Sequence, residues 1–447
     1  MQRLILVNPW IYDFAAYDLW AKPLGLLYIA GYLRKCGFDV NLIDCLDVYE
    51  PEMENTGLKK PKRRAYGTGK FYKQMIETPS KLKAIKRPYS RYGMTFEIFE
   101  KKLRSLPKPS AFLVTSVMTY WYPGVKEAIR IIKKIYPDIP VLLGGIYVRL
   151  CFEHAKTCGA DILVDSSDPE EILGYLEKAG ISIPEKKRFD PSCIYPAFDL
   201  YRRIDYVCIM TSRGCPYRCS YCASPFLNPK FCRRSPEDVF NEILFWHKRY
   251  GIRDFAFYDD ALLLSADSYI KPLLEMIIKE GLNVRFHTPN AIHIKGIDRE
   301  LSELMYKAGF KTIRLGLETI DMDLHKRLDR KLSSIEEFEK AVNFLFKAGF
   351  RSNQIGAYIL VGLPGQEISS VVRTIEFVGR MKVFPFLAEY SPIPHTALWD
   401  EAVRCSEFDL SEPLFHNNIL LPCWDEEKRK EYPKLKKMAL EIRKDLW

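Results

Sequence analysis

Three cysteines stand close together in one short loop of the sequence. Cys215, Cys219 and Cys222 are separated by three and then two residues, and Gly214 and Pro216 mark the segment as a turn. This spacing lets one loop wrap three thiolates around a face of an iron–sulfur cube, which leaves the fourth iron without a protein ligand. An open metal position is what chemistry at a metal requires. Buried structural cysteines or a zinc site are the alternatives, but a structural zinc takes four ligands.

The residues around this loop alternate between expected strands and expected helices. Apolar runs predict strands at 206–211, 253–258, 283–288, 311–317, 353–361 and 385–391. Helical spacing predicts helices near 235–250, 267–280, 299–308, 334–348 and 367–381. Six such βα units predict a partial (β/α)6 barrel, whose chemistry lies at the carboxyl ends of its strands. The cysteine loop follows the first strand directly, where such a barrel places its site.

A second alternating series occupies the N-terminal part of the chain. Strands are expected at 2–8, 38–44, 111–116, 141–145 and 161–165. This pattern predicts a doubly wound parallel sheet of the Rossmann or flavodoxin type, with ligands at the carboxyl ends of its strands. The fold class is therefore α/β. We expect the chain to divide, in order, into an N-terminal domain, a Pro-punctuated linker, a barrel and a tail, at 1–180, 181–203, 204–400 and 401–447.

Composition limits the class of protein. The 12 cysteines are scattered irregularly and no signal peptide precedes the first expected strand, which argues against a disulfide framework. The longest apolar run, near 355–364, is about half of the ~20 residues that a membrane span needs. We therefore expect a cytoplasmic protein with no membrane span.

The net charge of +10 comes from a single segment. Residues 52–108 contain 16 Lys and Arg against 5 Asp and Glu, while the remainder of the chain is balanced. Basic residues alternate with aromatic residues in this insert, as in 59–64 and 66–72. Such a mixture fits contact with a polyanion, either nucleic acid or an anionic lipid head. A solvated cover over the crevice of the first domain is the alternative.

The cysteine loop, with Tyr221 before its last cysteine, resembles the signature of the radical S-adenosylmethionine (radical SAM) enzymes. The resemblance implies that Cys215, Cys219 and Cys222 hold a 4Fe–4S cluster and are the catalytic and metal-binding residues. It also implies SAM contacts at the strand ends, made by Tyr221, Asp259, Asp260, Glu318, Gly362 and Leu363. A helix N-cap is the alternative role for the two aspartates, and an ion pair with Arg314 or a lysine is the alternative for Glu318.

The N-terminal half resembles the cobalamin-binding domain that precedes the barrel in class B radical SAM methylases. Residues 23–30, 142–146 and 153–154 carry this resemblance. It implies cobalamin contacts from Ser116, Met118, Thr119, Gly144, Gly145 and Ile146. The Asp-x-His-x-x-Gly motif of many corrinoid proteins is absent, so no histidine stands there as lower axial ligand. A flavodoxin-like domain that binds no cofactor is the alternative.

Together the two resemblances imply a cobalamin-dependent radical SAM methyltransferase that acts on an unactivated carbon through a 5′-deoxyadenosyl radical. Such an enzyme uses a 4Fe–4S cluster, SAM, cobalamin and an external one-electron reductant. Its substrate is a small molecule or a modified polymer, for which the expected contacts are His287, Tyr358 and Glu389. A histidine with its bonds satisfied inside the barrel is the alternative for His287.

Two other functions fit the same residues. A radical SAM rearrangement or cyclisation enzyme would use the same barrel without methyl transfer. A protein of another class would bind SAM or cobalamin, or bind RNA beside an iron–sulfur cluster, without turnover.

Overall fold

The computed structural model describes residues 2–185, 194–328 and 332–447. The chain divides into two compact units, 1–205 and 206–447. Part of the predicted linker, 186–193, lies outside the described residues. None of the described helices combines the length and the apolar character needed to cross a lipid bilayer.

The first unit is built on five parallel strands. In sheet order these are β3 (Asp39–Asp44), β1 (Arg3–Asn8), β6 (Ala111–Val114), β7 (Val141–Leu143) and β8 (Ile162–Leu163). Numbered along the chain, this is the 2-1-3-4-5 order of flavodoxin-like folds. In such folds the strand order reverses between the first and third strands, at the topological switch point. Leu4 of β1 pairs with Val40 of β3 and with Ala111 of β6. Ligand chemistry is therefore expected where β1 and β6 end.

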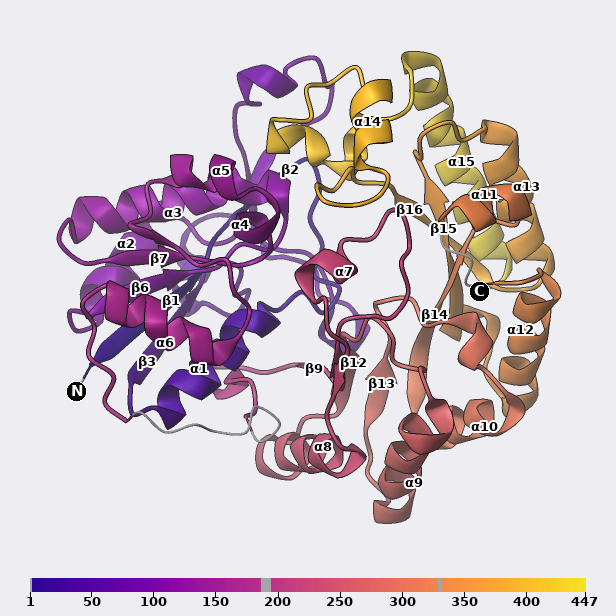
Figure 1. Cartoon of the computed structure of the whole chain (residues 1–447), viewed down its shortest axis with the longest axis horizontal. Helices are drawn as coiled ribbons and strands as arrows, with labels where there is room; N and C mark the ends of the chain where they lie inside the picture. The colour runs from indigo at the N-terminus through magenta and orange to yellow at the C-terminus, as the bar shows by residue number, and fades with distance from the viewer. Residues whose placement is uncertain (1, 186–193, 329–331) are drawn as a thin grey trace. The chain divides into compact units, whose positions relative to one another are not determined.

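Helices cover both faces of this sheet (Figure 1). The helices are α1 (Leu24–Lys35) and α6 (Pro169–Lys178) on one face, and α2 (Phe96–Ser105), α3 (Tyr122–Ile135), α4 (Ile146–Leu150) and α5 (Phe152–Ala155) on the other. Because successive side chains of a strand point to opposite faces, Leu4 and Leu6 join the core under α1 and α6. Ile5 and Val7 join the core under α2 and α3. The predicted doubly wound sheet is confirmed.

The basic insert at 52–108 is partly folded into the first unit. It contributes two strands to a small antiparallel sheet, whose order is β2 (Ile11–Asp13), β5 (Ser90–Tyr92) and β4 (Lys73–Met75). Met53, Tyr72 and Met94 of the insert are buried in the core beneath α2 and α3. The insert is thus more than a solvated cover, and contact of its lysines with a polyanion stays a prediction.

The second unit is built on six parallel strands. In sheet order these are β9 (Val207–Ile209), β12 (Asp254–Phe257), β13 (Arg285–His287), β14 (Phe310–Glu318), β15 (Ile355–Val361) and β16 (Phe384–Glu389). All five pairings between neighbours are parallel. The described strands leave β9 and β16 as the two edges of an open sheet. The partial barrel predicted from six βα units is confirmed.

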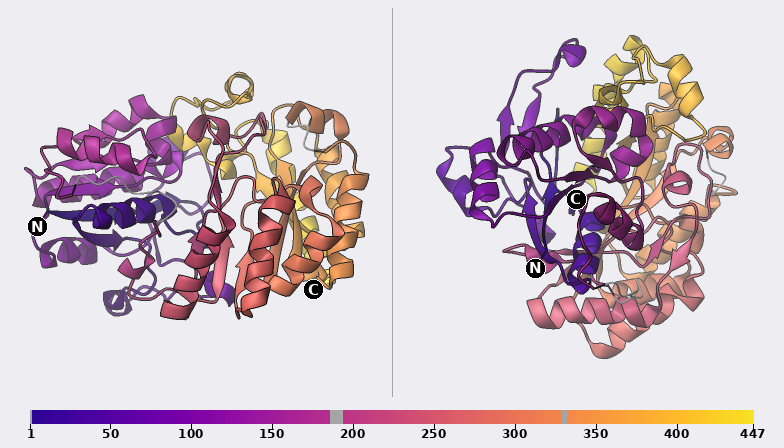
Figure 2. Two further views of the ribbon diagram at one scale, coloured as in Figure 1. Left: turned by 60° about the horizontal axis from the view of Figure 1, so that its bottom comes forward. Right: turned by 60° about the vertical axis from the view of Figure 1, so that its left-hand side comes forward.

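Helices follow the strands around the outside of the open barrel (Figures 1 and 2). They are α8 (Pro236–Tyr250), α9 (Ile270–Glu280), α10 (Arg299–Ala308), α11 (Met322–Leu328), α12 (Glu336–Ala348) and α13 (Ile368–Arg380). Helices α8, α9, α10 and α12 each end at a glycine in the left-handed conformation, which ends a helix at little steric cost. After β16 the chain forms α14 (Trp399–Cys405) and α15 (Glu426–Asp445), and α15 packs beside β16.

Candidate active site

The cysteine loop begins as the chain leaves β9. Its first residues form a short antiparallel ribbon in which β10 (Ser212–Arg213) pairs with β11 (Cys232–Arg233). Gly214 follows with a φ of +78°. A Cβ atom at this position would lie 2.7 Å from the carbonyl oxygen of Lys230. Glycine is therefore required here both by the backbone conformation and by the close approach of the ribbon.

A buried carboxylate anchors the start of the loop. The Asp259 side chain is 3% exposed, and its Oδ1 accepts bonds from the hydroxyl groups of Thr211 and Ser212 at 2.6 and 2.7 Å. The same oxygen accepts from the backbone N–H groups of these two residues at 3.1 and 2.6 Å. Burial raises the pKa of Asp259, and these bonds to the ionised form act in the opposite direction. The Asp259 carboxylate thus holds the start of the loop, and its predicted contact with SAM stays a prediction.

The three cysteines of the loop border one cavity of about 350 Å³. Its other walls come from the ends of several strands and from the start of α7 (Ser224–Leu227), and they comprise Tyr221, Ser224, Asp260, Pro289, Asn290, Ala291, His293 and Tyr358. The Cys222 sulfur accepts a hydrogen bond from the backbone N–H of Ser224 at 3.4 Å. Bonds of this kind favour a thiolate over a thiol.

The donor set of this cavity suits an iron–sulfur cluster. Three thiols from one loop face a space that further protein atoms enclose, and thiolate is the ligand that such clusters take. The backbone fixes the loop on both sides, because Ser220 donates to the carbonyl of Leu328 at 2.6 Å and accepts from the N–H of Leu398 at 2.9 Å. The residues present therefore fit a cluster with one iron left open.

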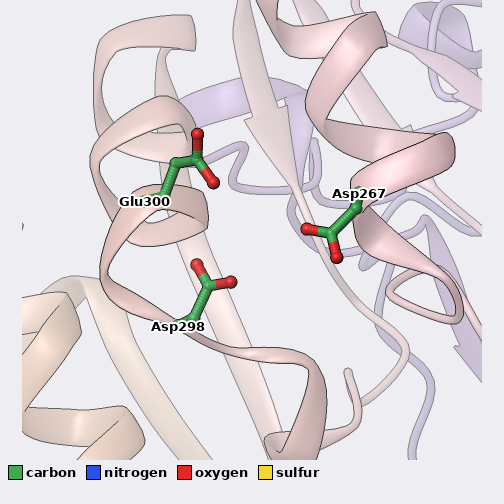
Figure 3. Close-up of side chains that lie close together, drawn as sticks. All are labelled: Asp267, Asp298 and Glu300. Atoms are coloured by element: carbon green, nitrogen blue, oxygen red, sulfur yellow. The ribbon is translucent and has the colours of Figure 1, made fainter.

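A second group of possible metal ligands is already occupied by a side chain. Asp267, Asp298 and Glu300 direct their carboxylates toward one another (Figure 3). The ammonium group of Lys271 lies 2.6 to 2.9 Å from a carboxylate oxygen of each of them. This ammonium group lies between the three acids, where a metal ion would lie, so the four side chains form an ion-pair network at the surface.

The comparison with known families agrees with the geometry of the cavity. Residues 209–378 match the family model of the radical SAM superfamily, and this range contains the cysteine loop and β12 to β15. This part of the chain is a radical SAM domain. The sequence expectation drawn from the cysteine loop is confirmed.

Two methyltransferases are similar in sequence to this chain. An uncharacterized methyltransferase of Pyrococcus horikoshii, PH0819, is 26% identical over 69% of this chain and 72% of its own length. The cytidylyl-2-hydroxyethylphosphonate methyltransferase of Streptomyces wedmorensis is 21% identical over 93% of this chain and 84% of its own length.

A solved structure shares the fold over nearly the whole chain. It is the radical SAM methyltransferase TsrM from Kitasatospora setae, with cobalamin and a 4Fe–4S cluster bound. The TM-score is 0.68, at 15% identity over 99% of this chain and 89% of that chain. At this identity the likeness concerns the fold, and both the doubly wound unit and the open barrel are included in it.

Three of the predicted SAM contacts come together in the radical SAM barrel. The hydroxyl group of Tyr221 donates to Oε1 of Glu318 at 2.8 Å, which joins the cysteine loop to the end of β14. Glu318 has a φ of +60°, an uncommon conformation for a residue with a side chain. Asp260 borders the cysteine cavity, where the Ser224 hydroxyl group donates to it and burial raises its pKa. Their role toward SAM stays a prediction.

The structure gives Gly362 and Leu363 a different explanation. Their N–H groups both donate to Oε1 of Gln366, at 2.9 and 3.3 Å, so neither is left for an adenine. Gly362 has a φ of +93°, and a Cβ atom there would lie 2.8 Å from the side chain of Leu421. The glycine therefore admits the C-terminal segment, and the approach of an adenine to Gly362 and Leu363 stays a prediction.

Of the three predicted substrate contacts, only Tyr358 borders the cavity. His287 is fully buried, with Nδ1 at 3.0 Å from the Thr312 hydroxyl group and Nε2 at 3.1 Å from Oδ1 of Asp254. Burial lowers its pKa, so it is a neutral histidine with satisfied bonds. Glu389 accepts from the hydroxyl group of Tyr432 in α15. Neighbouring elements thus engage both side chains, which matches the alternative given for His287, and a role of His287 or Glu389 toward substrate stays a prediction.

Two residues of the cavity were missed by the sequence analysis. Asn290 donates to the carbonyl oxygen of Tyr258 at 3.0 Å. The His293 ring packs against Tyr217 of the cysteine loop, with ring centroids 4.4 Å apart, and its Nε2 lies 3.3 Å from the carbonyl oxygen of Asp260. Both follow the third strand of the barrel, and polar residues after a strand end were the available signal.

The predicted cobalamin residues lie on the two loops that follow β6 and β7 in the first unit. The Ser116 hydroxyl group donates to the carbonyl of Gly144 at 2.7 Å, and the N–H of Ile146 donates to the Ser116 carbonyl at 2.9 Å. Gly145 has a φ of +101°, and a Cβ atom there would lie 2.2 Å from this carbonyl oxygen. The glycines thus let the two loops pack together, and the approach of a nucleotide tail to them stays a prediction.

The same two loops expose apolar side chains. Val117 is 38% exposed and Ile146 is 40% exposed, although both are large aliphatic residues at the carboxyl edge of a buried sheet. Met118 is half-buried and Thr119 is buried. Because the switch point beside β6 is where such a sheet binds ligands, these side chains fit the face of a large apolar ring.

Proposed function

We propose that this radical SAM protein is a cobalamin-dependent methyltransferase acting on an unactivated carbon of a small molecule. The observation that carries the proposal is the cavity bordered by Cys215, Cys219 and Cys222 at the carboxyl ends of a parallel barrel. Similarity to two methyltransferases over most of the chain, and the shared fold of a third, support methyl transfer as the reaction.

Each part of the cavity has a distinct task in this proposal. The cysteines hold a 4Fe–4S cluster, and Asp259 fixes the loop that carries them. Glu318, oriented by Tyr221, and Asp260 offer carboxylates to the polar end of SAM. Bound cluster and SAM supply one-electron chemistry, and an external reductant provides the electron.

The first unit provides the second cofactor site in this proposal. Val117, Met118 and Ile146 would contact the corrin ring, and Ser116 fixes the loop from which two of them project. Bound cobalamin supplies a carrier for the methyl group. The support for a corrin site is that aliphatic side chains are exposed at the switch point of the sheet. Exposure of such side chains to water is unfavourable, and a bound apolar ring would cover them.

Anaerobic reconstitution tests the barrel chemistry. The wild-type protein is expected to bind about four irons per chain and to release 5′-deoxyadenosine from SAM under dithionite. The triple variant in which the three loop cysteines become alanine is expected to do neither. Cys232→Ala is the matched control, because this cysteine is exposed on the neighbouring ribbon and does not border the cavity. Equal iron in both variants would contradict the proposal.

Methyl-labelled SAM then distinguishes methyl transfer from rearrangement. Transfer of label to carbon of the product supports the methyltransferase, and an unlabelled product supports a rearrangement or cyclisation. Cobalamin binding is tested separately by a visible absorbance titration of the protein. Val117→Glu and Ile146→Glu are expected to abolish binding by placing charge against the ring, whereas Val403→Glu, a substitution at another exposed valine, is expected to leave it unchanged.

A further inference from the structure

The guanidinium group of Arg314 lies inside the barrel. Arg314 is level with Gly356, which is two residues before the cavity residue Tyr358 on β15. Tyr358 borders that cavity, so the face of β15 that carries Tyr358 and Gly356 is the inner face. Arg314 of β14 pairs with Gly356, and a Cβ atom at Gly356 would lie 3.2 Å from Cδ of Arg314. Glycine at this position therefore makes room for the arginine side chain. The Arg314 guanidinium carbon lies 4.4 Å from the ring centroid of Phe386.

A second arginine approaches the same ring. The guanidinium carbon of Arg443, from α15, lies 4.8 Å from the Phe386 ring centroid, and its Nη1 donates to the carbonyl of Pro385 at 3.1 Å. Two positive charges therefore share one aromatic side chain at the inner edge of β16. Burial lowers the pKa of both arginines, and the charge of Arg443 lowers the pKa of Arg314 further.

Neither arginine has an acidic partner among the residues that the structure describes. Arg314 donates to the carbonyl of Ile313 at 3.0 Å and bonds to the Tyr358 hydroxyl group. Asp254, on β12 two strands away in the sheet, is already held by Arg285 at 2.7 Å and by His287. A guanidinium has five N–H donors, so Arg314 keeps several for another acceptor. Arg314 and Arg443 are half-buried, and partly buried charge without an acidic partner leaves a place for the negative charge of a ligand.

Arg314 is a basic neighbour of the cysteine cavity. The three cysteines and Asp260 border this cavity, where the cluster and SAM are expected. Tyr358 also borders it, donates to the carbonyl of Pro289 at 2.9 Å and contacts Arg314, which is not itself a wall residue. A ligand with an anionic end that extends past Tyr358 would meet this guanidinium.

We propose that the substrate carries an oxyanion, such as a carboxylate, phosphate or phosphonate, and that Arg314, with Arg443 beside it, binds this group beneath Tyr358. The planar fork of a guanidinium suits the two oxygens of such a group. This assignment rests on the proposed function for calling the ligand a substrate. Arg314 and Arg443 are then specificity-determining residues.

The test uses the full-length protein, with inorganic phosphate and methylphosphonate as probes in isothermal titration. Wild-type protein is expected to bind one probe molecule, and Arg314→Met is expected to weaken binding about tenfold or more, as loss of bonds to a charged group does. Arg443→Met is expected to weaken it to a smaller extent, and Arg314→Lys to keep part of it. Arg373→Met is the matched control, because Arg373 is exposed on the outer helix α13.

Three results would overturn the proposal. They are no probe binding by the wild type, equal loss in Arg314→Met and Arg373→Met, and loss of SAM affinity in Arg314→Met with probe binding intact. The last result would assign the guanidinium to the carboxylate of SAM. Circular dichroism checks that the variants are folded, and Arg443→Met provides an independent measurement if Arg314→Met is not. Probe binding requires no cluster, so its failure is distinct from absence of 5′-deoxyadenosine.

Discussion

Replacement of Asp259 is the sharpest test of how the cysteine loop is held. One carboxylate oxygen of this buried residue receives four hydrogen bonds from Thr211 and Ser212, which directly precede the loop. Asp259→Ala would leave two backbone N–H groups and two hydroxyl groups without that acceptor. Asp259→Asn would keep an acceptor oxygen of the same size and remove the charge.

The magnitude follows from the number of donors and their burial. A buried donor left unsatisfied costs about 1–3 kcal/mol, but hydroxyl groups rotate toward other acceptors and the terms do not add. Counting the two N–H groups gives about 2–6 kcal/mol for Asp259→Ala. Charge-assisted bonds are about twice as strong as neutral ones, and relief of carboxylate burial offsets part of their loss. We expect about 1–2 kcal/mol for Asp259→Asn.

Two measurements make this prediction specific to the loop. Urea unfolding gives the change in the free energy of unfolding, and iron per chain after anaerobic reconstitution reports whether the cysteines still converge. We expect iron content to fall in the order wild type, Asn, Ala. Asp323→Ala, at an exposed aspartate, is the control and is expected to match the wild type. Wild-type iron and stability in Asp259→Ala would refute the reasoning.

Three further predictions follow from single contacts. Tyr221→Phe is expected to keep iron but to weaken SAM binding about tenfold in equilibrium dialysis, because Glu318 loses its orienting bond; unchanged affinity would argue against this role. Gly145→Ala is expected to lower the melting temperature and abolish cobalamin binding, whereas Gly174→Ala, with nothing within 4 Å, is expected to stabilise by about 0.5–1 kcal/mol; similar melting curves would contradict the packing argument. Burial lowers the pKa of His287 from 6.5, so the folded protein binds fewer protons at this residue than the unfolded protein does. The free energy of unfolding is therefore expected to fall as the pH drops below about 6.5. His287→Gln is expected to weaken that pH dependence, which urea titrations at pH 7 and 5.5 would measure.

The fold was largely predictable from local pattern. Alternating strands and helices with short connections admit few arrangements, because parallel strands need a crossover helix and its handedness is fixed. The expected helices at 235–250 and 299–308 correspond to α8 and α10 within one residue. The strands β4 and β5 of the insert were not predicted, since three-residue strands with mixed side chains carry no clear periodicity.

The sequence by itself determined the cysteine loop, because three cysteines lie within eight residues and follow a strand. Only the tertiary structure decided what neighbouring acids do. Asp259 and Asp260 are adjacent, yet one is enclosed by loop donors and the other borders the cavity. Likewise, the surroundings of Arg314 are formed by Gly356, Phe386 and Arg443, which come from other elements. A side chain's chemistry is set by its burial and partners, and those partners are distant in sequence.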